Sequence, residues 1–276
     1  MSDTDDGIDG LDGRDGTVLE GLRAAVLMLA GSDARLAAHD GRAVRRLGVS
    51  LAATGLGGGG LVAVAWAMAA NACPWWHDTH LPLMATAAVL ALLALGGRRW
   101  LAAPGELLAP GRADGGLVTT AVMIVLALCL LGIVPFHREP SNLPAWLAWT
   151  RPPEEYRVLL AMGMWGAWAM MTPTHFCRHR PDAPPLVAAF ARTHPLPVTA
   201  GWMAVTLAVS LWELSFLSLP WVILPGAAGL LAGGAGAVAL CRATGGISRR
   251  GLLAANLATQ LAFLLGYLVG KSHLIH

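Results

Sequence analysis

Apolar stretches alternate with short polar segments along most of the chain. Each apolar stretch is close to the roughly 20 residues with few charges that a helix needs to cross the hydrocarbon core of a bilayer. The predicted spans are residues 47–70, 81–97, 117–136, 158–173, 196–219, 222–241 and 252–270. This pattern predicts an all-α fold, a polytopic integral membrane helix bundle of about seven transmembrane helices.

The segment before the first span has two parts with different patterns. Residues 1–16 repeat Asp-Gly without the ligand spacing of a calcium loop, and we expect a disordered acidic tail. Residues 17–46 predict an amphipathic helix followed by a basic linker. The apolar positions that recur at three- and four-residue steps are Val18, Leu19, Leu22, Val26 and Leu29. Such a helix lies either on the membrane surface or against the cytoplasmic face of the protein.

Residues 47–276 are predicted to form one transmembrane bundle, because no segment between spans is long enough to fold by itself. The first span contains Gly55 and a run of glycines at 57–60. Gly229 and Gly233 form a GxxxG step, as do Gly266 and Gly270. Small residues allow membrane helices to approach closely, so these positions predict close helix packing.

The distribution of basic residues predicts the orientation of the bundle. With the N-terminus in the cytoplasm, only four of the 19 Arg and Lys residues fall outside: Arg138, Arg151, Arg157 and Lys271. Because cytoplasmic loops carry an excess of Arg and Lys, this imbalance favours a cytoplasmic N-terminus and an extracytoplasmic C-terminus across seven spans.

Composition narrows the class of protein further. Hydrophobic residues make up 55% of the chain and charged residues 13%, against about 25% charged in soluble domains. The acidic start without an early apolar core argues against a cleaved signal peptide. The arginines are spread over several loops, so we expect no nucleic-acid binding. The four cysteines have neither zinc-finger nor CxxC spacing.

Five histidines fall near the predicted outer ends of spans. They are His77, His80, His137, His273 and His276. Imidazoles from separate helix ends, together with a carboxylate, are ligands that a divalent metal or a haem iron uses. The alternative is that these histidines occupy the membrane interface as half-apolar residues without binding anything. No cofactor is identified by this pattern, and a metal or haem remains possible.

Glu213 is a carboxylate inside the fifth predicted span, near its outer end. A charged group at this depth is costly in free energy, so it should face a partner, the bundle interior or a water-filled cavity. It predicts a proton or cation site or, alternatively, an ion pair that fixes helix packing. Asn256 and Gln260, one turn apart in the seventh span, extend a polar seam toward it or only join helices by hydrogen bonds.

The stretch around Pro173 offers a second candidate, on the cytoplasmic side. His175 and His179 would share a face if Pro173 starts a short helix, and two histidines at that step can chelate a metal. Cys177 would point away from them. The methionines just before, among them Met170 and Met171, suit copper(I), but methionine is also a common filler of irregular cores.

Three functional hypotheses follow. The leading one is a membrane protein without a visible catalytic motif, acting as an accessory or assembly subunit of a membrane complex in a bacterial-type inner membrane. Its partners would be lipid, other membrane subunits or a second copy of the chain. The alternative is a metal, haem or small-cation binding or transport protein that uses the outer histidines and Glu213. An intramembrane enzyme is the least favoured, because the sequence has no HExxH, GxSxG or P-loop motif.

Overall fold

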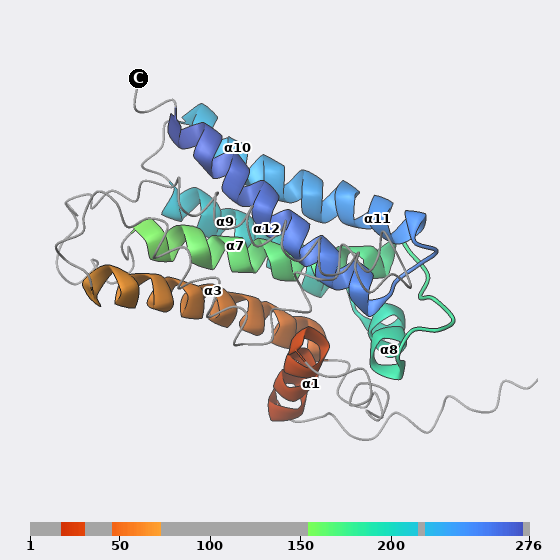
Figure 1. The fold of residues 1–276 in the computed structure, drawn as a ribbon. Coiled ribbons are helices and arrows are strands. Elements are labelled where there is room, and N and C mark those ends of the chain that lie inside the picture. Colours follow the sequence, from red (N-terminus) through yellow and green to blue (C-terminus); the bar gives the residue numbers. More distant parts are fainter. Residues whose placement is uncertain (1–17, 31–45, 73–153, 215–218, 273–276) are drawn as a thin grey trace, which may run out of the picture.

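A computed structural model describes residues 18–30, 46–72, 154–214 and 219–272 of the chain. The regular secondary structure of this part is helical, apart from one isolated bridge between His179 and Ile247. The long helices lie side by side with roughly parallel or antiparallel axes, and two short helices, α1 and α8, lie at one end of them (Figure 1). The fold class predicted from the sequence is therefore confirmed as all-helical.

The helices and their bounds follow the chain order. They are α1 (Val18–Ala30), α3 (Leu47–Ala72), α7 (Glu154–Met171), the 3₁₀ helix η5 (Thr172–His175), α8 (Pro185–Thr193), α9 (Leu196–Glu213), α10 (Leu219–Leu231), the π-helix η6 (Ala232–Gly236), α11 (Ala237–Ala243) and α12 (Arg249–Ser272). Helical backbone angles at Leu231 and Ala237 make α10, η6 and α11 one continuous helix.

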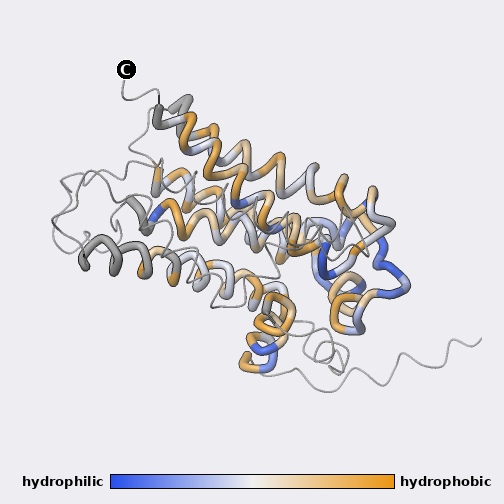
Figure 2. The backbone as a smooth tube through the Cα atoms, in the orientation of Figure 1, coloured by the Kyte–Doolittle hydropathy of each residue, from blue (hydrophilic) through white to orange (hydrophobic). Residues whose placement is uncertain are grey.

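Some of these helices are long and apolar enough to be membrane spans. Two stretches qualify by length and composition, Ile223–Ala243 and Arg249–Gly270. A third qualifies if α8 and α9, which meet at 85°, form one broken span. The orange colouring along the long helices and the blue colouring at one end show the same separation of apolar and polar residues (Figure 2). The number of seven spans stays a prediction, because residues 81–97 and 117–136 lie outside the described residues, as does the tail at 1–16.

Glycine brings α3 and α7 into backbone contact, as the sequence predicted for the first span. A Cβ on Gly59 would overlap the carbonyl oxygen of Leu159, and a Cβ on Gly163 would overlap that of Gly55. Gly55 faces residues 163–167 while Gly59 faces residues 159–160, so the two helices run antiparallel. Both helices approach closely because no side chain separates their backbones.

The Gly229–Gly233 step seats two tryptophans of α7. A Cβ on Gly229 would come within 2.8 Å of the ring of Trp165, and one on Gly233 within 2.9 Å of the ring of Trp168. The two indoles meet edge to face, with ring centroids 5.5 Å apart. The two glycines of this GxxxG step therefore make room for two large rings from α7.

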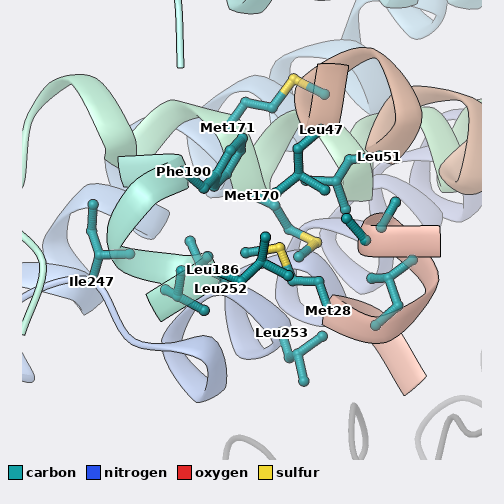
Figure 3. Packing of buried hydrophobic residues seen from close by; sticks show 14 of the residues in the cluster. Met28, Leu47, Leu51, Met170, Met171, Leu186, Phe190, Ile247, Leu252 and Leu253 are labelled. Carbon is teal, nitrogen blue, oxygen red and sulfur yellow. The ribbon is translucent and has the colours of Figure 1, made fainter. Parts of the chain in front are cut away.

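A core of buried apolar residues fills the end of the bundle where α1 and α8 lie. Met170 and Met171 of α7 meet Leu47 and Leu51 of α3 there, together with residues of α1, α8 and α12 (Figure 3). Both methionines are fully buried. They pack mainly among apolar residues, as methionine does when it fills an irregular core.

Helix α1 forms where an amphipathic helix was expected, but it packs with a different face. Of the apolar positions that defined the pattern, only Leu29 is buried. The packed face consists of the smaller Ala24 and Ala25 together with Met28. Small side chains let α1 lie close to α3, while the larger ones stay on the outside. Helix α8 was not predicted. It has only nine residues and begins at prolines, so this segment was interpreted as a loop between two spans.

Candidate functional site

Two histidines from different elements converge on one threonine hydroxyl. His175 is the last residue of η5, His194 ends α8, and Thr199 lies in the first turn of α9. The Nε2 atom of His175 lies 2.7 Å from Oγ1 of Thr199, and Nε2 of His194 lies 2.8 Å from the same oxygen. The two imidazole rings are 5.5 Å apart. These three residues are referred to below as the His–Thr–His cluster.

The surroundings of His194 favour a neutral imidazole. Its side chain is buried, and its ring lies 4.8 Å from that of Phe190. On its other side, a Cβ on Gly48 would come within 2.6 Å of Nδ1, so only glycine leaves room for the ring. Burial, and next the charge that His175 can carry, lower the pKa of His194 to about 4. Burial also lowers the pKa of His175.

The hydrogen-bonding capacity of these groups fixes the direction of the bonds. Nδ1 of His194 is buried and has no hydrogen-bond partner among the described residues. A buried donor without an acceptor is costly in free energy, so the proton of neutral His194 belongs on Nε2. His194 then donates to Thr199, and the Thr199 hydroxyl donates to Nε2 of His175. Protonating His194 would place a proton on the enclosed Nδ1, which is a structural reason for its lowered pKa.

The predicted pairing of His175 with His179 is not the one that the structure forms. Pro173 lies in a short helix as expected, but that helix ends at His175, so the two histidines share no helical face. Nδ1 of His179 lies 3.2 Å from the carbonyl oxygen of Arg180. Cys177 turns to α11, with Sγ 3.7 Å from the carbonyl oxygen of Val238. The partner of His175 is His194, which the sequence placed on the same side of the membrane but did not pair.

A signal for this pairing was available in the sequence. His175 follows Pro173 by two residues, and His194 directly precedes Pro195. Proline marks helix boundaries, so these positions indicate that both imidazoles lie at helix ends, although this signal was not used for His194. The role of Thr199 depends on the 85° angle between α8 and α9, which residue spacing does not reveal.

The cluster offers two nitrogen ligands and one hydroxyl. Among the described residues, no group of three or more His, Cys, Asp or Glu side chains is placed to hold a metal ion. The arrangement can hold and pass a proton between two imidazoles through a hydroxyl. It can also lock η5, α8 and α9 together, because each element contributes one member.

Asn256 joins α12 to α7, and Gln260 bonds to Asn256 within α12. Nε2 of Gln260 donates to Oδ1 of Asn256 at 2.7 Å, and Nδ2 of Asn256 lies 3.3 Å from Sδ of Met170. Gly166 leaves room for these amides, because a Cβ there would come within 2.6 Å of the Gln260 nitrogen. The bond from Asn256 to Met170 is interhelical, whereas the bond from Gln260 to Asn256 lies within α12; a polar seam from these amides toward Glu213 stays a prediction.

A small cavity lies beside these amides, between α3, α7 and α12. Its volume is about 20 Å³, and its lining is mostly glycine and apolar side chains. Gly55, Gly163, Met162, Asn256 and Gln260 all contribute to the lining. The cavity is thus a gap at a glycine-rich helix crossing, with one polar wall.

Glu213 is the final residue of α9, so its backbone lies at the end of the helix opposite to the His–Thr–His cluster. The neighbouring Trp212 is 57% exposed, which suits an aromatic side chain at a membrane interface. Arg157, one of the expected partners of Glu213, is buried near the start of α7. The five outer histidines, His77, His80, His137, His273 and His276, lie outside the described residues.

Comparison with known proteins identifies no relative: no family model, no curated protein and no solved structure matches this chain significantly.

Proposed function

We propose that the protein is a seven-span membrane protein of a bacterial-type inner membrane and serves as an accessory or assembly subunit of a larger membrane complex. The proposal has a topological part and a functional part. They rest on different observations and are tested separately.

The direction of the described helices supports an odd number of spans. Helix α3 ends, and α7 begins, at the end of the bundle away from α1. Any spans between them must therefore come in an even number, and the sequence predicts two there, at 81–97 and 117–136. Helices α7, α9, α10–α11 and α12 then alternate in direction. Together with α3 these make seven spans, with the two termini on opposite sides.

The charges support a cytoplasmic location for the end that carries α1. The arginines of the described residues gather at this end, and six of them are exposed: Arg23, Arg46, Arg178, Arg192, Arg242 and Arg250. The described charged positions at the opposite end are Glu154, Glu155, Arg157, Glu213 and Lys271. An excess of arginine on one side is characteristic of the cytoplasmic side of an inner-membrane protein.

The use of the buried polar side chains favours the accessory role. Asn256 of α12 donates to the Met170 sulfur of α7 at 3.3 Å, Trp165 donates to Ser210 of α9 at 3.0 Å, and Trp202 donates to the Met164 carbonyl at 3.3 Å. Each of these bonds joins two different helices, so these side chains contribute to helix packing. Apolar side chains such as Leu61 of α3 and Trp212 of α9 are left exposed on the outside. Neighbouring helices or lipid would cover them.

The test is purification of the tagged chain from its native membrane in a mild detergent, followed by native mass measurement. A photoreactive amino acid at Leu61, which is 52% exposed, reports what contacts α3, and the same group at buried Met164 is the matched control. We expect a stoichiometric partner chain that crosslinks from position 61. A single chain that crosslinks only to lipid would refute the accessory role.

A second candidate is a metal, haem or small-cation handler that uses the outer histidines and Glu213. The His–Thr–His cluster favours it, because two neutral imidazoles at the cytoplasmic end could exchange protons or cations with a path that starts at Glu213. The deciding variant is Glu213→Gln. Loss of a cation- or proton-linked activity in a folded protein would support the handler, whereas tolerance of this change and of alanine at all five outer histidines would exclude it.

A further inference from the structure

Helix α1 has three distinct sectors around its axis. One sector packs on the bundle and consists of small or buried residues, namely Gly21, Ala24, Ala25, Met28 and Leu29. At about 100° per residue, the adjacent sector carries Leu22, Val26 and Leu19, which are 39%, 50% and 75% exposed. The exposed Arg23 follows, then the half-buried Leu27 and the exposed Glu20. The apolar sector thus separates the protein-facing side from the polar side.

The position of α1 is fixed at both ends of the helix. Near its start, a Cβ on Gly21 would come within 2.7 Å of the Ser50 hydroxyl of α3, so the two backbones are close. At its other end, the side chain of Arg249 donates from Nε to the Met28 carbonyl at 2.8 Å and from Nη2 to the Leu27 carbonyl at 3.4 Å. A cation at these carbonyls also complements the negative end of the helix dipole. The contacts of the packed sector therefore leave the adjacent apolar sector facing outward.

The apolar sector adjoins the outer face of a predicted span. Helix α3 begins beside α1 and exposes Val49 (59%) within its first turn, then Leu56 (41%) and Val64 (46%) farther along. An apolar outer face on a membrane helix is the face that contacts acyl chains. Because α1 packs against the first turn of α3, it lies at the level along α3 where the bilayer interface would be.

The charge at this end of the bundle complements an anionic surface. The six exposed arginines named above surround the positions of α1 and α8, while the described acidic residues there are Glu20 and Asp182. Asp182 is already paired with Arg180 at 2.9 Å. Basic residues beside a membrane helix are attracted to anionic headgroups within a Debye length of the surface.

We propose that α1 is an interfacial helix that binds the anionic leaflet, with Leu19, Leu22 and Val26 among the upper acyl chains and Arg23 beside lipid phosphates. An apolar sector bordered by a cationic one is the arrangement with which amphipathic helices lie in the membrane plane. From its sequence, this helix could lie on the membrane surface or against the protein. In the proposed arrangement it does both, because α1 contacts the protein with one face and the lipid with the adjacent face. It rests on membrane embedding and is independent of the accessory role.

The test places an environment-sensitive fluorescent amino acid at Leu19 or, as the matched neighbour on the polar sector, at Glu20. Each full-length variant is reconstituted alone into vesicles of phosphatidylethanolamine and phosphatidylglycerol. Doxyl groups near the lipid headgroup quench a fluorophore in the interface, and iodide quenches one in water. We expect lipid quenching to be several-fold stronger at position 19 than at position 20, with the opposite order for iodide.

Lipid charge provides the second arm. Replacing phosphatidylglycerol with phosphatidylcholine, or introducing Arg23→Gln, should reduce lipid quenching at position 19. Equal iodide quenching at positions 19 and 20 would place the apolar sector in water and overturn the proposal. Protection of position 19 from both quenchers would also overturn it, because a protein segment or a second copy would then cover the sector. Neither outcome bears on whether a partner subunit is found.

Discussion

Gly163 of α7 lies directly against the carbonyl oxygen of Gly55 of α3, in a contact that leaves no space for a side chain on either helix. The obstacle to a Cβ at Gly163 is backbone, which cannot rotate away as a side chain can. The tight crossing of these two helices therefore depends on the absence of two side chains. It also determines the distance between α3 and the rest of the bundle.

Gly163→Ala is expected to destabilise the protein by about 1–3 kcal/mol, the usual range for overpacking a tight contact. The helices must separate because the added methyl group meets the Gly55 backbone. Thermal unfolding in detergent measures this as a lower midpoint. Gly57→Ala is the matched control, since a Cβ there meets nothing within 4 Å. An unchanged midpoint for Gly163→Ala would show that α3 and α7 do not cross in this way.

The bond between Trp165 and Ser210 leads to a second prediction. Ser210→Ala removes the acceptor of a buried indole N–H and should cost about 0.5–1.5 kcal/mol, as for hydrogen bonds inside membrane proteins. A double-mutant cycle with Trp165→Phe isolates this pair and should return a coupling of similar size.

Thr206 supplies the opposite case on the same helix. Its hydroxyl is buried and has no hydrogen-bond partner among the described residues. Thr206→Val removes an unsatisfied polar group and should leave stability unchanged or raise it by up to about 1 kcal/mol. If Thr206→Val and Ser210→Ala lower the unfolding midpoint equally, the hydrogen bond to Trp165 is not the reason why Ser210 contributes to stability.

The sequence could predict the elements that depend on local pattern. The apolar runs at 47–70 and 252–270 correspond to α3 and α12 because span length and low charge are encoded residue by residue. The close approach of α3 was expected from its glycines for the same reason. The face with which α1 packs could not be predicted in this way. Ala24 and Ala25 are buried in place of the larger leucines and valines because of contacts with α3, and the sequence of α1 does not reveal those contacts.

The candidate site was less predictable than the helices. His175 was identified as a candidate, but its partner depends on how two distant segments meet. The distance between His175 and His194 is set by the end of η5 and by the bend between α8 and α9, neither of which has a residue spacing that identifies it. The buried Arg249 likewise looked like one of many cytoplasmic arginines, although it bonds to the end of α1.

Acid should weaken the His–Thr–His cluster. Burial and the neighbouring His175 lower the pKa of His194 from 6.5 to about 4 in the folded protein, so between these values the unfolded chain binds more protons than the folded one. Stability must then fall as the pH falls from about 6.5 to about 4, and the contribution of His194 to this loss is about 3 kcal/mol, because each unit of pKa shift corresponds to about 1.36 kcal/mol. Unfolding midpoints measured across this range provide the test.

Two variants assign this acid sensitivity to the cluster. His194→Gln keeps a neutral donor for Thr199 and should flatten the pH profile between 6.5 and 4. His179→Gln changes a histidine that takes no part in the shared hydroxyl and should keep the profile of the unaltered protein. If both variants retain the full loss of stability in acid, other groups cause it.

The orientation of the bundle predicts where the C-terminus lies. Helix α12 starts at the arginine-rich end, where Arg249 bonds to α1, and its other end leads to the C-terminus. If the arginine-rich end is cytoplasmic, a reporter fused after His276 is exported. Alkaline phosphatase, which folds to an active form only outside the cytoplasm, should then be active, and a green fluorescent protein fusion at the same point should be dark.

Truncation after Gly245, between α11 and α12, is the control. It removes one span and should exchange the two signals, because the last helix before the fusion would then end in the cytoplasm. A phosphatase that is inactive after His276 and active after Gly245 would reverse the orientation proposed for the whole bundle.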